Sequence, residues 1–311
     1  MKNFKSFIKN IYYFLKCLFG PSLNLKDLNN LHENILYIKN LRKNELKCFA
    51  QKYENLYALD DNFEKKNENS NIERSFFSQN GEDGILSEIV SKVGKGDSLF
   101  VELGSGGFSS NAILFWSIFN WDVVLIDGSK KALNEIEKKC EVISKLLSTK
   151  KKIHYLNTFI EPENINNIVP EKFKKKEVTI FSIDIDGNDF WILKKLSLRP
   201  RIIVAEYNSF FGSKESLTIP YTKNFERRKF DKKGIYYGAS LGAIKKAIEK
   251  EYAFLGVESN GINCFFVRKD LYNNELNKLD LQQFCHNKNM MVENPSLDIR
   301  KHLLNYSLTK V

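Results

Sequence analysis

Two pairs of polar residues have the types and the spacing needed for proton transfer or for metal binding. Asp184 and Asp186 stand two residues apart after the apolar run 178–183. Glu206 and Asn208 have the same spacing after the next apolar run. Residues two apart on an extended chain point to one face, so each pair can converge on one ligand. Such oxygens suit Mg²⁺ or Ca²⁺, and a carboxylate can also take the proton of a weakly acidic hydroxyl. The alternative is that Asp184 caps the next helix and Glu206 binds a ligand directly.

A glycine-rich turn is the second chemical element. The run 100–103 leads into Gly104-Ser105-Gly106-Gly107, and the acid Glu102 stands two residues before the first glycine. Glycines let a backbone bend tightly and approach a ligand, and a helix after the turn offers free N–H groups. Asp127 follows Gly104 at roughly the 20-residue spacing at which a carboxylate holds ribose hydroxyls. This order of strand, turn, helix, strand and acid predicts a nucleotide-type cofactor beside the turn.

These residues need a scaffold that brings distant strand ends together. From residue 98 onward, short β-branched or aromatic runs alternate with helical runs, which is typical of a parallel sheet with crossover helices. We expect strands at 100–103, 122–126, 152–156, 178–183, 201–205, 252–257 and 263–267, and helices near 110–119, 130–148 and 241–250. Functional groups in such sheets collect beyond the carboxyl ends of the strands. The sequence therefore predicts that the polar residues share one sheet edge.

The glycine pattern separates two classes of cofactor. A dinucleotide fingerprint requires a third small residue three positions after its second glycine, where this chain has Ser109. Glu102 instead gives E-x-G-x-G. That form resembles motif I of the Rossmann-like methyltransferases, in which the acid lies near the amino-acid part of S-adenosylmethionine. An oxidoreductase with a nucleotide cofactor is the alternative enzyme.

Further motifs follow one another in a recognisable order. They are Ser78–Gly84 (S-Q-N-G-E-D-G), the E-x-G-x-G turn, Ile126–Ser129, the D-I-D-G-N-D segment, Glu206–Asn208 and Tyr237–Ser240. Together they resemble the FkbM-type methyltransferases and their bacterial S-Q-x-G-E-D relatives, over about residues 72–270. The D-I-D-G-N-D-F-W-I-L run is similar to the family pattern K-x-D-x-E-G-x-E-x-x-x-L. Asp186 and Asp189 take its two glutamate positions, and Ser182 stands in place of its lysine.

This resemblance implies an α/β, Rossmann-like class I methyltransferase fold, with a mostly parallel seven-stranded sheet and helices on both faces. It implies S-adenosylmethionine as cofactor, with Mg²⁺ where the acids bind a metal. The implied reaction is O-methylation of a small-molecule or carrier-linked carbohydrate or phospho-sugar of surface polysaccharide (capsule) biosynthesis. A catalytically silent scaffold with a recruiting helical N-terminus is the alternative from another class.

The candidate site residues follow from these patterns and from the resemblance. The predicted cofactor-binding residues are Gln79, Glu82, Asp83, Glu102, Gly104, Ser105, Gly106, Asp127, Gly128, Ser129 and Asp184. The predicted catalytic residues are Asp184, Asp186 and Glu206, and a metal would be held by these three and Asn208. The predicted substrate-binding residues are Asp189, Tyr207, Asn208, Arg227, Arg228 and Tyr237. For the N-G-E-D run the alternative is a turn before a helix, where acids favour the helix dipole.

The segment 210–237 is long, contains Pro220 and carries a run of basic residues. A loop of this length beside an active-site edge is typical of a lid or a binding loop. Its basic side chains can hold a phosphate of an activated sugar. A solvated charge run is the alternative interpretation.

The two ends of the chain have other patterns. Residues 1–20 place apolar side chains on one helical face and lysines on the other, which predicts a basic amphipathic helix. Such a helix either lies in a membrane interface, through residues 1–19, or packs on protein, and its lysines are too frequent for a spanning segment. We expect a helical segment and polar linker at 21–71, the methyltransferase domain at 72–275 and a helical extension at 276–311.

Composition narrows the partners and the compartment. The five cysteines are scattered with no C-x-x-C pair, so we expect a reducing, cytoplasmic setting. The alternative location is peripheral, on the inner face of the cytoplasmic membrane. The net charge of +10 favours acidic partners. No nucleic-acid partner is expected, because the chain lacks the motifs of nucleic-acid methyltransferases and its basic residues do not interleave with aromatic ones. The oligomeric state is left open.

Overall fold

The computed structural model describes residues 72–285, 299, 301–303 and 305–311, apart from 107–108 and 148. The predicted helix 1–20, the segment 21–71 and Gly107 lie outside these residues. No helix in the described part of the chain is long and apolar enough to cross a membrane.

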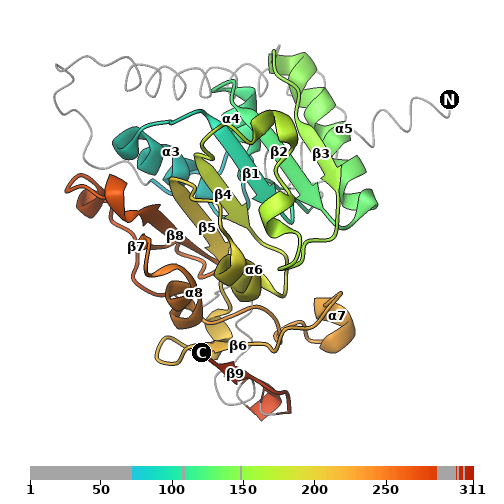
Figure 1. Cartoon of the computed structure of the whole chain (residues 1–311), viewed down its shortest axis with the longest axis vertical. Coiled ribbons are helices and arrows are strands. Elements are labelled where there is room, and N and C mark those ends of the chain that lie inside the picture. The colour runs from blue at the N-terminus through green and yellow to red at the C-terminus, as the bar shows by residue number, and fades with distance from the viewer. Residues whose placement is uncertain (1–71, 107–108, 148, 286–298, 300, 304) are drawn as a thin grey trace, which may run out of the picture.

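A seven-stranded sheet forms the centre of the molecule (Figure 1). Its strands are β1 (Leu99–Leu103), β2 (Asp122–Asp127), β3 (His154–Asn157), β4 (Ile180–Ile183), β5 (Ile202–Glu206), β7 (Tyr252–Val257) and β8 (Asn263–Arg268). They are arranged in the order β3-β2-β1-β4-β5-β8-β7. The first five run parallel, and β8 runs antiparallel to both of its neighbours. This order, with one reversed strand, confirms the predicted class I methyltransferase fold.

Helices cover both faces of the sheet. The helices α3 (Glu82–Val93), α4 (Ile113–Ser117) and α5 (Lys130–Leu147) pack on one face, and α6 (Asp189–Lys195) and α8 (Leu241–Ile248) pack on the other. Short 3-10 turns at Ile165–Asn167 (η2) and Glu171–Phe173 (η3) complete the second face. Side chains alternate along each strand, so Phe100 joins the first core and Val101 the second. Each large apolar side chain buried in this way contributes about 1.5–3 kcal/mol.

Most of the predicted elements are present, with ends shifted by one or two residues. The helix predicted at 110–119 is shorter than expected, because the residues before it bind Glu102 and take no helical turn. Ser110 Oγ donates to Glu102 at 2.5 Å, and the Asn111 N–H donates to the same carboxylate at 2.9 Å. The buried carboxylate of Glu102 therefore makes the helix begin at Ile113.

The loop predicted at 210–237 carries structure of its own. It contains η4 (Ser209–Phe211), β6 (Leu217–Thr218) and α7 (Arg227–Phe230). Within the predicted helical extension 276–311, the described residues 299 and 301–303 are helical, and the domain bounds stay a prediction. After η5 (Lys269–Leu271) and η6 (Leu276–Lys278), the chain ends on β9 (Thr309–Lys310), which pairs antiparallel with β6.

We call residues 209–238, with the described residues from 299 to 311, the lobe. It projects from one end of the sheet, at the bottom of Figure 1. Its own small core contains Phe211, Ile219, Phe225, Ile235, Tyr236, Tyr237 and Leu303. The lobe is therefore an ordered attachment with a packed interior, which can hold a side chain in a fixed place.

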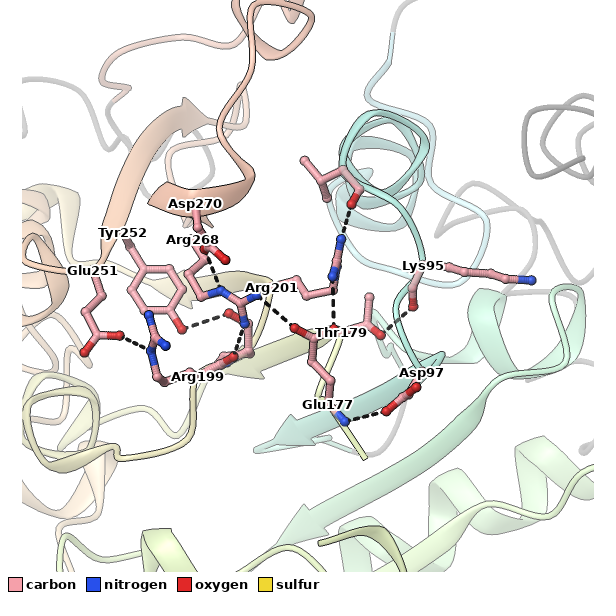
Figure 2. A network of polar contacts seen from close by, with 12 residues as sticks. Lys95, Asp97, Glu177, Thr179, Arg199, Arg201, Glu251, Tyr252, Arg268 and Asp270 are labelled. Carbon is pink, nitrogen blue, oxygen red and sulfur yellow. Dashed lines mark hydrogen bonds and ion pairs between the residues drawn. The ribbon is translucent and has the colours of Figure 1, made fainter. Parts of the chain in front are cut away.

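An ion-pair network ties together the opposite edge of the sheet (Figure 2). Glu177 accepts from Arg201 at 3.0 Å and from Arg268 at 2.9 Å. Arg268 also pairs with Asp270 at 2.7 Å, and Arg199 Nε pairs with Glu251 at 2.5 Å. These residues flank β4, β5, β7 and β8, so the network clamps the parallel part of the sheet to its final antiparallel pair.

Candidate functional site

The carboxyl ends of four strands bring the predicted site residues to one edge. Leu103 lies opposite Ile126 on one side and Ile183 on the other, and Ile183 lies opposite Ala205. Each of these four residues is followed in the chain by a predicted site residue: Gly104, Asp127, Asp184 and Glu206 in turn. Residues far apart in sequence thus form one row, as the sequence predicts.

The glycine turn after β1 is tight against β4 and open on its other side. Gly104 has φ +79°, and a Cβ added to it would lie 1.6 Å from the carbonyl oxygen of Asp184. Its N–H donates to the Ile126 carbonyl at 2.9 Å. Gly106 is exposed, and among the described residues a Cβ there would meet only the Gly104 carbonyl oxygen, at 4.0 Å. The Ser105 hydroxyl is buried without a hydrogen-bond partner among the described residues, so the turn retains a polar atom for a ligand.

Glu102 orders the chain on the far side of this turn. Its carboxylate is buried and accepts from Ser110 and from the Asn111 backbone. Burial raises the pKa of Glu102 to about 7, against the lowering effect of these hydrogen bonds. Its observed partners are therefore protein groups that shape the turn.

Asp127 and an aromatic ring lie at the end of β2. The Ser129 N–H donates to Asp127 Oδ1 at 2.6 Å. Burial raises the pKa of Asp127, and the charge of Asp186 raises it further. A Cβ on Gly128 would lie 2.8 Å from Phe159, whose ring is 43% exposed. Sequence analysis missed Phe159, whose only signal is its place just after the third strand.

Asp184, Asp186 and Glu206 form a carboxylate cluster. One oxygen from each lies within 4.8 Å of the others. Glu206 is buried, Asp184 is partly buried and Asp186 is exposed with φ +57°. Burial, followed by the charges of Asp186 and Asp189, raises the pKa of Asp184 to about 8. Burial and the charge of Asp184 raise the pKa of Glu206 well above its ordinary value. The cluster therefore favours either a shared proton or a bound cation.

Arg227 from the lobe supplies a positive charge to this cluster. Its Nη1 contacts Asp186 Oδ1 and lies 3.8 Å from Glu206 Oε1. The guanidinium carbon lies 3.5 Å from the centre of the Tyr237 ring. Both predicted residues, Arg227 and Tyr237, thus reach the site. The guanidinium contacts two carboxylates, which oppose phosphate binding at the same place.

The predicted roles of Asn208 and Tyr207 do not agree with their contacts. The Asn208 amide donates to the carbonyls of Ile235 (2.8 Å) and Tyr237 (2.9 Å), and its oxygen accepts from the backbone of η4. It therefore holds the lobe and is corrected from metal ligand to structural residue. Tyr207 points to the other face of the strand, where its hydroxyl donates to the Cys285 carbonyl at 2.6 Å. Its side chain is buried away from the cluster.

Asp189 and Arg228 also serve neighbouring backbone groups. Asp189 accepts from the N–H groups of Ile185 and Gly187, both at 3.0 Å. It holds the turn that carries Asp186, while Asn188 is the N-cap of α6, so the alternative that Asp184 caps this helix is wrong. Exposed Arg228 donates to the carbonyls of two lysines in the lobe. Substrate contacts by Asp189 and Arg228 stay predictions.

The S-Q-N-G-E-D segment is held by its own groups. Asp83 accepts from the Phe77 N–H and the Ser78 hydroxyl, both at 2.7 Å, and burial raises its pKa to about 6. Glu82 accepts from the Asn80 N–H at 2.7 Å and from Asn263 of β8 at 2.8 Å. Gln79 is exposed. Cofactor contacts by Gln79, Glu82 and Asp83 stay predictions. Glu82 joins α3 to β8, and Asp83 holds the segment before α3.

Sequence analysis also missed Asp231, which organises the lobe. Its buried carboxylate accepts from the N–H groups of Ile235 (2.8 Å) and Tyr236 (3.1 Å) and contacts His302 Nε2 at 2.9 Å. Hydrogen bonds from Ile235 and His302 outweigh burial and lower the pKa of Asp231 to about 2. Its position within a run of basic residues was the only available signal.

Comparison with known proteins adds distant likenesses of fold. No protein-family model matches the chain, and no curated protein does. The methyltransferase domain of bacterial CtHen1 is 11% identical, with 60% of this chain and 96% of that chain covered and a TM-score of 0.38. An S-adenosylmethionine-dependent methyltransferase from Clostridium acetobutylicum is 11% identical, with 60% and 90% covered and a TM-score of 0.37. An O-methyltransferase from Bacillus cereus in complex with SAH is 18% identical, with 60% and 80% covered and a TM-score of 0.36. The fold assignment rests on the order and direction of the strands.

Proposed function

We propose that this chain transfers a methyl group from S-adenosylmethionine to a hydroxyl of a carbohydrate or phospho-sugar. The observation that carries the proposal is the order of groups along one sheet edge. Asp127 follows β2, the glycine turn follows β1, and the carboxylate cluster follows β4 and β5. This row provides, in sequence, a ribose-binding acid, a close backbone approach and groups able to accept a proton.

The residues around the glycine turn fit the proposed cofactor. Gly106 leaves open space, and the Ser105 hydroxyl is a buried polar atom without a partner among the described residues. Asp127 would hold ribose hydroxyls, and the exposed ring of Phe159 beside Gly128 would cover the adenine. When bound, S-adenosylmethionine supplies an electrophilic methyl group on a sulfonium. Gly104 and Ser105 would set the depth at which this ligand lies.

Asp184 and Glu206 would remove the proton of the acceptor hydroxyl. Burial raises the pKa of Asp184 to about 8 and that of Glu206 well above its ordinary value, so the pair holds a proton at neutral pH and Asp184 becomes a proton acceptor as the pH rises past about 8. Holding the acceptor oxygen beside this pair would also align it for in-line attack. Arg227, at the rim of the cluster, would limit the negative charge that the pair builds up.

The cluster also fits a divalent cation such as Mg²⁺. Three carboxylates offer oxygen ligands within 4.8 Å of one another, and Glu206 Oε2 is buried without a hydrogen-bond partner among the described residues. Asp184, Asp186 and Glu206 would hold the ion, which would polarise the acceptor hydroxyl. Activity measured with EDTA and then with restored Mg²⁺ separates this role from that of a metal-free base.

The most detailed part of the proposal concerns the chemical class of the methyl acceptor. The basic residues of the lobe, among them Arg228, Lys232 and Lys233, are exposed and suit a phosphate carried by a sugar. Such a sugar, free or on a carrier, belongs to surface polysaccharide synthesis in the cytoplasm. The contact of residues 1–19 with the inner membrane face is part of the same proposal.

Calorimetric titration with S-adenosylmethionine, S-adenosylhomocysteine and NADH tests the cofactor. We expect micromolar binding of both sulfur ligands and none of NADH. Methyl transfer from labelled cofactor to a panel of nucleotide sugars, with and without Mg²⁺, then tests the acceptor. Binding of NADH without either sulfur ligand would replace the proposal with an oxidoreductase. Absence of all three would favour a scaffold.

A further inference from the structure

A protein cation already lies beside the carboxylate cluster. Arg227 Nη1 contacts Asp186 Oδ1 and lies 3.8 Å from Glu206 Oε1. The other carboxylate oxygen of Glu206, Oε2, is buried with no hydrogen-bond partner in the described part of the chain, and Glu206 is only 6% exposed. The cluster therefore has a ligand atom that Arg227 does not satisfy. Arg227 also takes an Asp186 oxygen that an external ion would need.

The position of Arg227 is fixed from outside the cluster. Its Nε donates to the Gly234 carbonyl at 2.7 Å, and its guanidinium lies 3.5 Å from the centre of the Tyr237 ring. A planar guanidinium held by stacking and by a backbone carbonyl loses little further freedom when it contacts a carboxylate. The lobe thus holds the positive charge of Arg227 in a fixed position beside the carboxylate cluster.

The turn that carries Gly234 is itself supported by the C-terminal residues. Asp231 binds the backbone on both sides of Gly234 and contacts His302 Nε2 at 2.9 Å. The Tyr236 ring stacks on Tyr306, with ring centres 4.4 Å apart. The hold of Arg227 on the cluster is therefore transmitted from residues 302–306 through Asp231 and the turn.

We propose that Arg227 is an internal cation that competes with a divalent metal ion for the carboxylate cluster. The C-terminal residues set the strength of this competition. In the metal-free state Arg227 pairs with Asp186 and lies 3.8 Å from Glu206. A divalent ion gains Glu206 Oε2 and the Asp186 oxygen only when the guanidinium withdraws. Two positive charges this close repel strongly where water is partly excluded. The inference rests on the metal part of the proposed function and does not require methyl transfer.

Calorimetric titration of the full chain with Mn²⁺ alone tests the competition. We expect Arg227→Gln to bind Mn²⁺ at least tenfold more tightly than the unchanged protein. Arg228→Gln is the matched control, because it removes the same charge from the next residue, whose partners are backbone carbonyls. Arg227→Lys keeps the charge but loses the stacking on Tyr237 and the bond to the Gly234 carbonyl, so its Mn²⁺ affinity should lie between those of the unchanged protein and Arg227→Gln. Equal or weaker binding by Arg227→Gln, an equal gain in Arg228→Gln, or no Mn²⁺ binding in any variant would each overturn the proposal.

A second variant tests the route from the C-terminal residues. His302→Ala removes one contact of Asp231 without touching the cluster, and it should tighten Mn²⁺ binding by a smaller factor, about threefold. Unchanged Mn²⁺ affinity in His302→Ala would overturn the part assigned to the C-terminal residues. S-adenosylhomocysteine titrated into the same samples reports on the cofactor separately. Failure of the proposed function and failure of the competition therefore give different results.

Discussion

The carbonyl oxygen of Asp184 lies where the Cβ of any other residue at position 104 would have to be. The separation from an ideal Cβ on Gly104 is 1.6 Å, well inside the closest approach of non-bonded atoms. Gly104 begins the turn after β1, and Asp184 begins the turn after β4. The proposed cofactor turn and the carboxylate cluster are thus held together by one backbone contact that only glycine permits.

Gly104→Ala should therefore damage both stability and cofactor binding. We expect a loss of about 3 kcal/mol or more in the free energy of unfolding, because the clash adds to the cost of a positive φ. Gly212→Ala is the control, since Gly212 has φ +83° but no atom within 4 Å of its Cβ position. Urea denaturation of both variants measures the difference. Similar losses in the two would show that the contact with Asp184 is unimportant.

Asp127→Asn should weaken binding of S-adenosylhomocysteine by about tenfold to a hundredfold, because charge-assisted hydrogen bonds to ribose are lost. Asp122→Asn removes a carboxylate from the other end of the same strand, where it pairs with Lys176 at 2.7 Å. Calorimetry on the two variants compares the strand ends directly. Equal affinities for the ligand would rule out a cofactor role for Asp127.

Glu206→Gln should stabilise the protein at alkaline pH while slowing methyl transfer. The folded protein holds protons on Asp184 and Glu206 that the unfolded chain has released above about pH 4, since their pKa values are raised. The free energy of unfolding therefore falls as pH rises from about 4 towards 8, and the substitution removes part of this fall.

Thermal melts at pH 5 and pH 9 measure the effect of Glu206→Gln. The gain in melting temperature over the unchanged protein should be larger at pH 9. The methyl-transfer rate of the unchanged protein should rise towards about pH 8, as the pair loses its shared proton. An equal gain in melting temperature at both pH values would contradict the repulsion between the carboxylates of Asp184 and Glu206.

Glu177→Gln should lower the free energy of unfolding by about 1–2 kcal/mol, because Arg201 and Arg268 both lose their shared carboxylate. Cofactor binding should be unchanged, since Glu177 and Arg201 precede β4 and β5, whereas the proposed site lies at the carboxyl ends of the parallel strands. Glu171→Gln removes one exposed pair with Lys174 and should cost less than about 0.5 kcal/mol. Denaturation measured at low and at high salt should show a smaller difference in unfolding free energy between the two variants at high salt, because salt screens the ion pairs.

The sheet was predictable because its strands are short apolar runs with sharp polar ends. The runs ending at Leu103, Ile183 and Ala205 became neighbouring strands in register, and this placed Gly104, Asp184 and Glu206 side by side. Periodicity along the chain was enough for this result, since parallel strands with crossover helices have few arrangements.

The lobe was not predictable in the same way. Its order depends on contacts between segments far apart in sequence, such as Asp231 with His302 and Tyr236 with Tyr306. Asn208 illustrates the difficulty, because its spacing from Glu206 predicted a ligand while the carbonyls of Ile235 and Tyr237 claimed its amide. A local pattern gives the face on which a side chain lies, but not which backbone groups compete for it.

The position of β8 has a consequence for the order in which the protein is made. Strand β5 pairs with β4 along one edge, and its other edge is covered only by β8, which follows it by more than fifty residues. During synthesis, the unpaired edge of β5 stays exposed until the ribosome has released residues 263–268. An exposed apolar edge recruits other strands. The intervening chain, which includes residues 209–238 of the lobe, is therefore made while the nascent protein most needs a chaperone.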